Sequence, residues 1–247
     1  MGLNSLKYRK KQMYILEGNI GVGKSTFLEL LNKNLQEITT FTEPLDNWNK
    51  KVYGQSLLAN FYESPKRWAY TMETLTMMSR VKQHLNDQNY ENQKFVVERS
   101  IYSGHYCFAL NGYKHGFFTQ IEWEIYTQWV DFLINQRCNP PHGFIYLKAD
   151  PEICFKRIQK RNRLNEKDIT LSYIKQIDEH HEDFLIKKNN VFENLKKVPV
   201  LVLDCNEDFL ESEQILNTHL YKVKKFIDET LGKEIKTSQK IVSQQQI

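Results

Sequence analysis

The sequence predicts an α/β fold in which a five-stranded parallel sheet is covered by helices on both faces. Short β-rich runs with apolar cores recur along the chain, helix-length segments separate them, and a glycine-rich loop follows the first run. Strands with continuous apolar cores are typical of parallel sheets that are buried on both sides. A chain of 247 residues can bury one sizeable core. We therefore expect one compact domain.

The expected strands are MYILEG (13–18), TTFTEP (39–44), KFVVERS (94–100), GFIYLKA (143–149) and VPVLVLD (198–204). The expected helices cover residues 24–36, 66–87, 120–136, 151–161, 170–188 and 212–230. Pro65 and Pro151 suit the first turn of a helix, where no backbone N–H is needed. We expect an N-terminal extension over residues 1–12, the domain over 13–231, and a disordered tail over 232–247, which are polar and rich in Gln.

Composition excludes several classes of function. No apolar run reaches the length of about 18 residues that a membrane span needs. The net charge of +4 is too small to create a long-range field for nucleic acid. The four cysteines form no C-x-x-C pair, so they indicate neither a zinc site nor a disulfide framework. With little room for a transit peptide before residue 13, we expect a soluble cytoplasmic or nuclear protein without nucleic-acid or membrane partners.

The segment GNIGVGKS, residues 18–25, fits the phosphate-binding pattern G-x-x-x-x-G-K-[ST] between an expected strand and an expected helix. Backbone N–H groups and the positive end of the helix can surround a phosphate, while Lys24 reaches its outer oxygens and Ser25 offers a hydroxyl to Mg²⁺. The loop residues that we expect to contact ATP are Gly18, Asn19, Ile20, Gly21, Val22, Gly23, Lys24, Ser25 and Thr26.

Other loops of this kind serve GTPases and motor ATPases, so the reaction class depends on other residues. The chain contains no D-x-x-G and no N-K-x-D, which argues against a guanine-nucleotide switch. Glu98 and Arg99 end the strand 94–100, at the sheet edge where open α/β folds bind ligands. There Glu98 could hold Mg²⁺ or its water, and Arg99 could clamp a phosphoryl oxygen. Glu43 ends the strand 39–44 and could accept a hydroxyl proton, while Trp48 could line a slot for an aromatic ring.

Several segments together resemble the deoxyribonucleoside kinase family, which includes deoxycytidine, deoxyguanosine, mitochondrial thymidine and insect multisubstrate kinases. The segments that carry the resemblance are GNIGVGKST, TEPLDNW, YESPKRWAYTMETLTMMSR (62–80), ERSIYSGHYCFA (98–109), RIQKRNRLNE (157–166) and LDCNEDF (203–209). They run in the family's order from about residue 13 to 230. The resemblance implies Mg²⁺-dependent transfer of the γ-phosphoryl group of ATP to the 5′-hydroxyl of a deoxyribonucleoside.

The resemblance also implies roles for particular residues. Glu43 matches the family's general base, and Arg99 matches the arginine that orients it. Tyr62 and Glu166 match the pair that binds the 3′-hydroxyl. Trp48 and Phe108 match the aromatic walls of the base pocket. The remaining matches are Leu58 in the substrate pocket, the lid arginines Arg157, Arg161 and Arg163 on the phosphates, and Glu207, Asp208 and Phe209 near adenine.

The lid arginines also have a physical interpretation of their own. Arg157 and Arg161 are four residues apart on an expected helix and therefore face the same way. Arg163 follows where that helix should end. Such a cluster suits a phosphate that is being transferred, although a solvated basic helix face is the usual meaning of such a run.

Two positions depart from the family's pattern and bear on base specificity. Met72-Glu73 stands where the family usually has phenylalanine and glutamine, and Gly104 stands where the cytidine and guanosine members have an aspartate that partners Arg80. An ionised Glu73 could accept both donors on the Watson-Crick edge of guanine, and Arg80 would be free for guanine O6 and N7. We expect a preference for deoxyguanosine. The alternatives are a contact between Glu73 and Arg80, or a pocket that Gly104 enlarges for several bases or for pyrimidines.

Two rival functions remain open at this point: a nucleoside monophosphate kinase of the thymidylate kinase type, and a non-catalytic regulator that binds nucleotide. The family pairs helices across a two-fold axis, and the segment EWEIYTQWVDFLINQ (122–136) carries more apolar residues than one buried stripe needs. We therefore expect a homodimer, with a fully buried core helix as the alternative.

Overall fold

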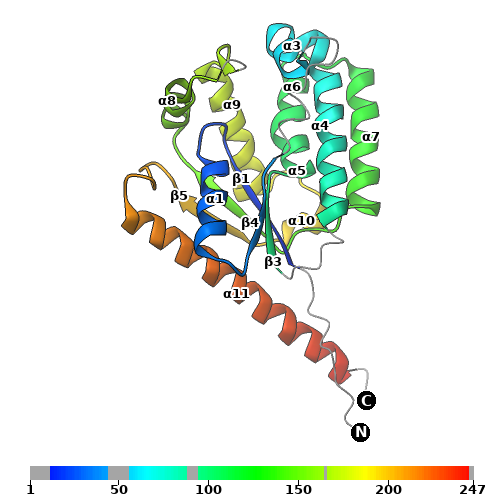
Figure 1. Cartoon of the computed structure of the whole chain (residues 1–247). Coiled ribbons are helices and arrows are strands. Elements are labelled where there is room, and N and C mark those ends of the chain that lie inside the picture. The colour runs from blue at the N-terminus through cyan, green and yellow to red at the C-terminus, as the bar shows by residue number, and fades with distance from the viewer. Residues whose placement is uncertain (1–11, 44–55, 88–93, 164–165, 245–247) are drawn as a thin grey trace.

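The computed structural model contains one parallel sheet with strand order β2-β3-β1-β4-β5 (Figure 1). It describes residues 12–43, 56–87, 94–163 and 166–244, with only the backbone described at residues 87 and 231–244. The strands are β1 (Gln12–Gly18), β2 (Thr39–Phe41), β3 (Lys94–Glu98), β4 (Gly143–Lys148) and β5 (Val200–Asp204). The five expected strands and the predicted fold class are confirmed, and three of the five strands (β2, β3 and β4) end earlier than we expected.

The helices of the described residues follow the strands in α/β order. They include α1 (Lys24–Asn34), α3 (Leu57–Glu63), α4 (Pro65–Asp87), α5 (Ile101–Ser103), α6 (Leu110–Lys114), α7 (Gln120–Gln136), α8 (Pro151–Arg161), α9 (Leu171–His181), α10 (Glu193–Lys196) and α11 (Glu213–Gln244), with π-helical segments at Gly104–Ala109 and Glu182–Lys187. Pro65 and Pro151 open α4 and α8, as their position in the sequence predicts. Thr119 and Glu122 form a capping box that fixes the start of α7.

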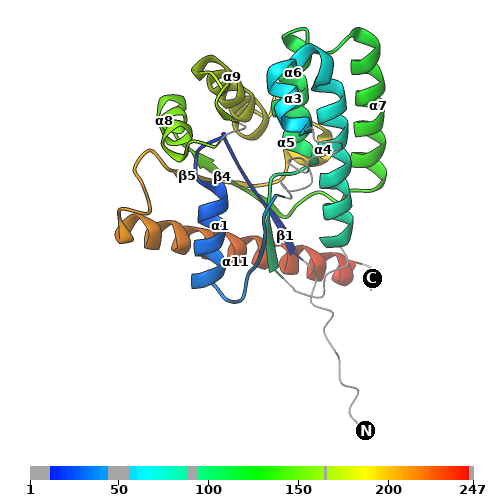
Figure 2. The same cartoon turned by 45° about the horizontal axis from the view of Figure 1, so that its top comes forward.

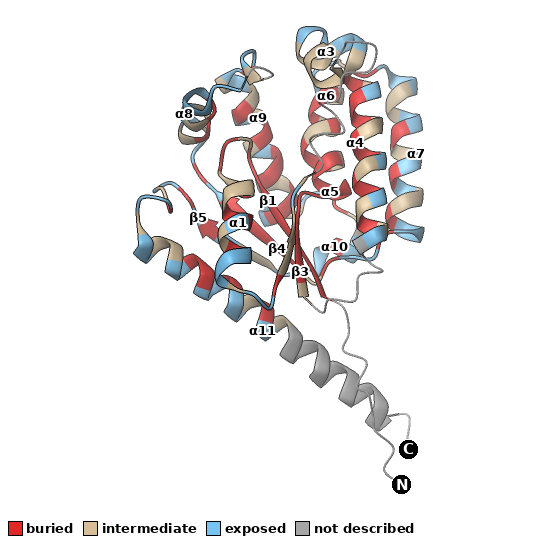
Figure 3. Cartoon of the chain, in the orientation of Figure 1, coloured by how far each residue is buried: buried red, intermediate tan, exposed pale blue. Residues whose placement is uncertain are grey.

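Successive residues of β1 point to opposite faces of the sheet, and so contribute to two separate cores. Met13 and Ile15 belong to the core under α4 and α7, whereas Tyr14 and Leu16 belong to the core under α1 and α11. Figure 3 shows the strands β1, β3 and β4 largely buried between these layers. Because β1 has apolar neighbours on every side, its sequence shows no alternation of apolar and polar residues.

The strand order places the glycine-rich loop at a point where the sheet's connections diverge. β1 lies between β3 and β4, and its carboxyl end therefore opens between the helices that follow those two strands. Figures 1 and 2 show α8 and α9 on one side of this opening and α3, α4 and α6 on the other. The fold thus creates a space above the loop that two separate groups of helices border.

The structure corrects the expected helices in four places. Residues 101–114 are helical, although we expected no helix there, and the capping box of Ser100 and Ser103 starts this segment. The short helices α3 and α10 were also missed. We expected a disordered tail from residue 232, but α11 continues to Gln244. Residues 233–244 contain no Pro or Gly, so nothing in this segment breaks a helix that has already begun. No helix in the described part of the chain is both long and apolar enough to cross a membrane.

Replacing Ile15 with Ala tests the importance of the central strand. Ile15 is fully buried, and its neighbours on the adjacent strands are Val97 and Phe144. We expect Ile15→Ala to lower the free energy of unfolding by about 2 to 5 kcal/mol, because it removes buried methyl groups and leaves a cavity. Leu210→Ala is the control, because Leu210 is 61% exposed, and it should change stability by less than about 0.5 kcal/mol. Equal effects of the two variants in urea unfolding would contradict the central position of β1.

Candidate active site

A cavity of about 360 Å³ lies at the carboxyl edge of the sheet, above the glycine-rich loop. Most residues that the sequence places in the site line this cavity: Ile20, Gly21, Gly23, Lys24, Ser25, Thr26, Glu43, Leu58, Tyr62, Met72, Glu73, Arg80, Glu98, Arg99, Phe108, Arg161, Arg163 and Glu166. They come from segments up to 146 positions apart in the chain, and the parallel sheet brings them together because its strands all end at one edge.

The glycine-rich loop needs glycine for two reasons. Gly23 precedes α1 with φ of 107°, in the left-handed region that side chains disfavour. Gly21 lies so close to α8 that a Cβ atom would be 2.4 Å from the carbonyl oxygen of Cys154. Lys24 curls back so that its Nζ donates to the carbonyl oxygens of Gly18 and Asn19, at 3.1 and 2.9 Å. Burial, reinforced by the positive charge of Arg99, lowers the pKa of Lys24 to about 7.

Ser25 and Glu98 form a compact group of oxygen atoms beside the loop. Ser25 Oγ donates to Glu98 Oε1 at 3.2 Å and to Oε2 at 3.1 Å. A hydroxyl and a carboxylate are the hard ligands that Mg²⁺ prefers. The described residues contain no group of three or more His, Cys, Asp or Glu side chains that could form a complete metal cage. This pair therefore fits a Mg²⁺ ion that takes its other ligands from phosphate and water.

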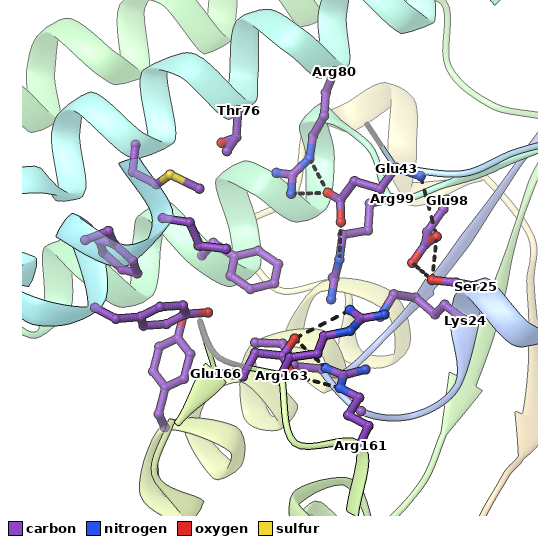
Figure 4. Close-up of a pocket in the computed structure, with 18 of the residues that line it drawn as sticks. Lys24, Ser25, Glu43, Thr76, Arg80, Glu98, Arg99, Arg161, Arg163 and Glu166 are labelled. Carbon is purple, nitrogen blue, oxygen red and sulfur yellow. Dashed lines mark hydrogen bonds and ion pairs between the residues drawn. The ribbon is translucent and has the colours of Figure 1, made fainter. Parts of the chain in front are cut away.

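Glu43 is held between two arginine side chains (Figure 4). Its Oε1 accepts from Arg80 Nε at 3.1 Å and from Arg80 Nη2 at 2.7 Å, while Arg99 Nε lies 3.4 Å from its Oε2. All three side chains are buried, and ionic groups that have left water require partners of this kind. Arg99 has φ of 62°, an unfavourable backbone conformation for a residue other than glycine, which is found at functional sites.

The position of Arg80 corrects our expectation that its guanidinium is free for guanine. Gly104 does leave space beside Arg80, because a Cβ atom at this position would lie 2.5 Å from Arg80 Nη1. The guanidinium occupies that space and turns to Glu43. Arg80 thus has a partner that we did not expect from the sequence, the carboxylate of Glu43, which follows β2.

The wall of the cavity opposite the loop is formed by α3, α4 and the segment after β3. Leu58, Met72 and Phe108 give this wall an apolar surface, and the guanidinium of Arg99 lies 4.7 Å from the centre of the Phe108 ring. Glu73 is the carboxylate in this wall and is 7% exposed. Thr76 Oγ1 lies 3.4 Å from Glu73 Oε2. Burial is the largest influence on Glu73 and raises its pKa to about 7, although the charge of Arg80 opposes the shift.

The lid arginines separate into two groups. Arg161 makes a two-pronged contact with Glu166, at 2.7 Å for each pair of atoms, and Arg163 lies 3.6 Å from the same carboxylate. Both arginines line the cavity, as does Tyr62. Arg157 points elsewhere, and its Nη1 donates to the carbonyl oxygen of Cys205 at 2.9 Å. It therefore anchors α8 to the loop after β5.

The loop after β5 holds the residues that we expect near adenine. Phe209 is buried and packs against the glycine-rich loop, so that a Cβ atom on Gly23 would lie 3.0 Å from its ring. Asp208 Oδ1 accepts from the backbone N–H of Leu210 at 2.9 Å, and Glu207 is exposed. None of these three residues lines the cavity. Trp48 lies outside the described residues.

Sequence reasoning missed Phe61, Thr76 and Tyr173, which also line the cavity. Thr76 could have been found, because it lies three residues after Glu73 and four before Arg80, on the same face of α4. Tyr173 comes from the first turn of α9, where no pattern in the sequence indicates a place in the cavity.

The comparisons with known proteins agree with this geometry. A sequence model described as deoxynucleoside kinase matches residues 14–228. The chain is 39% identical to the mitochondrial deoxyguanosine kinase of Xenopus laevis, covering 91% of this chain and 93% of that protein. It is 35% identical to deoxycytidine kinase 2 of Gallus gallus, covering 91% and 94%, and 34% identical to the deoxycytidine kinase of Homo sapiens, covering 86% and 89%. This chain therefore belongs to the deoxynucleoside kinase family and is an enzyme that phosphorylates deoxynucleosides.

Proposed function

We propose that this kinase transfers the γ-phosphoryl group of ATP to the 5′-hydroxyl of a deoxyribonucleoside, with Glu43 as the general base, and that it serves nucleotide salvage. The observation that carries this assignment is the position of Glu43 in the cavity, where its backbone N–H lies 3.5 Å from Glu98 Oε2. Glu43 thus borders both the group that suits Mg²⁺ and the space open to a nucleoside. A carboxylate in this position can take the proton of an attacking hydroxyl.

On the donor side, positive charge gathers where phosphoryl transfer needs it. Lys24 and the backbone N–H groups of the glycine-rich loop would hold the phosphates, with Arg161 and Arg163 above them. Ser25 and Glu98 would hold Mg²⁺, which when bound neutralises charge on the phosphate oxygens. Glu166 pairs with Arg161 and Arg163, so an ATP phosphate would compete with this carboxylate for the two arginines.

On the acceptor side, Tyr62 and Glu166 would bind the 3′-hydroxyl of the sugar, because both line the cavity. The base would lie between the apolar side chains of Leu58, Met72 and Phe108. Deoxyguanosine is the proposed preferred substrate, since an ionised Glu73 in this wall can accept from both N1–H and N2–H of guanine. The 39% identity to a deoxyguanosine kinase supports this choice.

The proposed assembly is a homodimer through α7. Tyr126, Val130 and Ile134 form a stripe that is buried in the core. A second apolar stripe of Ile121, Ile125 and Trp129 lies at four-residue spacing and is exposed. An exposed apolar stripe of this kind is typical of an association surface. The proposed compartment is the cytoplasm, which suits four buried cysteines that are free thiols.

Glu43→Gln tests the general base. We expect kcat to fall by about 10² to 10⁴, because the amide cannot take a proton, while nucleoside affinity changes only a few-fold. Glu63→Gln is a matched control, since Glu63 is exposed on α3 and lies outside the cavity. Steady-state kinetics with ATP and each deoxynucleoside measure both variants. A Glu43→Gln enzyme that keeps more than about a tenth of wild-type kcat would rule out Glu43 as the base.

The base preference is tested by comparing kcat/KM for the four deoxynucleosides near neutral pH. We expect deoxyguanosine to be used best, by roughly 10² over the poorest base, because a buried polar group without its partner is costly. Equal or better use of deoxycytidine or thymidine would refute the guanine preference and favour a broad or pyrimidine specificity.

Trp129→Glu tests the dimer. A buried charge in the exposed stripe of α7 should convert a dimer at micromolar concentration into a monomer in light scattering, without loss of helical signal. Ile186→Glu is the control, because Ile186 is exposed outside α7 and should leave the mass unchanged. A wild-type protein that is already monomeric would exclude this assembly.

A further inference from the structure

Glu73 occupies an unusual environment for a carboxyl group. It lines the main cavity and also borders a small hollow whose walls include Phe61, Phe117 and Phe118. Only 7% of its surface is exposed. A carboxylate in such surroundings has lost its water and requires a cation or several donors to remain ionised.

The partners of Glu73 do not meet that requirement. The nearest cation on its own helix is Arg80, whose Nε and Nη2 are engaged by Glu43 Oε1. Thr76 has one hydroxyl proton for two acceptors, the backbone oxygen of Glu73 at 3.1 Å and its Oε2 at 3.4 Å. Among the ion pairs of the described residues, none involves Glu73. The carboxyl group is therefore available to the ligand in either protonation state.

The charged and titratable groups around Glu73 come from several elements. Arg80 on α4 and Arg99 after β3 favour its ionised form, and Glu43 after β2 disfavours it. Tyr62, Tyr126 and Tyr173, on α3, α7 and α9, are titratable groups on which the charge of Glu73 acts, and burial raises the pKa of each tyrosine. Burial outweighs these charges and raises the pKa of Glu73 to about 7. Neutral and ionised forms thus occur together near neutral pH.

The two forms of a carboxyl group complement different bases. A carboxylate only accepts, which matches the adjacent N1–H and N2–H donors of guanine. A carboxylic acid donates through its O–H and accepts through its carbonyl oxygen, as the family's glutamine does through its amide. This pattern matches adenine, which presents the N6–H donor beside the N1 acceptor.

We propose that Glu73 is a titratable specificity residue. In its ionised form it binds guanine, and in its protonated form it binds adenine, so that binding of the base is coupled to binding of a proton. This inference rests on the proposed nucleoside pocket and deepens it. Binding of deoxyguanosine would release the proton of Glu73 to solvent, whereas binding of deoxyadenosine would take a proton from solvent. By linkage, a higher pH favours deoxyguanosine and a lower pH favours deoxyadenosine.

The direct test is isothermal titration calorimetry of the full chain with each purine deoxynucleoside at about pH 7. Repeating each titration in buffers with different ionisation enthalpies gives the number of protons exchanged. We expect release of about half a proton with deoxyguanosine and uptake of about half a proton with deoxyadenosine, because Glu73 is about half protonated there. The two purines have the same ring system, so contributions from Lys24 and other groups cancel in the difference.

Glu73→Gln is the matched variant, because the amide keeps the size of the side chain but does not titrate. It should remove the difference in proton exchange between the purines. It should also weaken the binding of deoxyguanosine and change the affinity for deoxyadenosine only a few-fold. In wild-type enzyme the kcat/KM ratio of deoxyguanosine to deoxyadenosine should rise about ten- to hundredfold from about pH 6 to about pH 8, and stay constant in the variant.

Proton exchange of the same sign and size for the two purines would overturn the proposed role of Glu73 but not the nucleoside pocket. A difference in proton exchange that stays unchanged in Glu73→Gln would do the same. Failure of both nucleosides to bind would overturn the proposed nucleoside pocket together with it. Opposite signs that disappear in the variant would establish the coupling.

Discussion

The contact of Glu43 with Arg80 and Arg99 is the interaction on which the site depends. Each of these side chains is buried, so each would carry a large desolvation cost without the others. They come from the end of β2, from α4 and from the end of β3, and the parallel sheet supplies the common edge at which these segments meet. Arg99 reaches Glu43 through an unfavourable backbone conformation, and a hydrogen bond from its N–H to the carbonyl oxygen of Leu16 fixes that conformation.

This contact links the two halves of the cavity. Glu43 lies beside Glu98 and Ser25, on the side proposed to hold the phosphates, while Arg80 belongs to the helix that carries Glu73 and Thr76, on the side proposed to hold the base. Arg80 is engaged by Glu43, and although its charge still favours the ionised form of Glu73, no ion pair of the described residues joins the two. The charge state of the base pocket thus depends on a carboxylate whose proposed role lies in the chemical step. Gly104 permits the arrangement because any larger residue would collide with the guanidinium.

The sequence predicts well what short patterns determine. The strands and the glycine-rich loop are local patterns, and Lys24 and Ser25, which the loop pattern singles out, line the cavity. The direction of Arg80 could not be predicted, because it depends on the space left by Gly104 and on Glu43, which is 37 positions away. Arg157 likewise turns to a backbone oxygen of a distant loop. The helical character of residues 101–114 was not predicted because glycine and polar residues obscure their helical pattern. The continuation of α11 was not predicted because we took polarity as a sign of disorder, and polarity alone does not prevent a helix.

The most direct measurement of the proposed mechanism is a crystal structure of the chain with deoxyguanosine and a non-hydrolysable ATP analogue. We expect the 5′-oxygen within hydrogen-bond distance of a Glu43 oxygen and in line with the γ-phosphorus, with the phosphates on the loop around Lys24. The base should lie against Glu73. A 5′-oxygen that contacts another carboxylate, or a nucleoside whose sugar points away from the glycine-rich loop, would contradict Glu43 as the group that receives the proton.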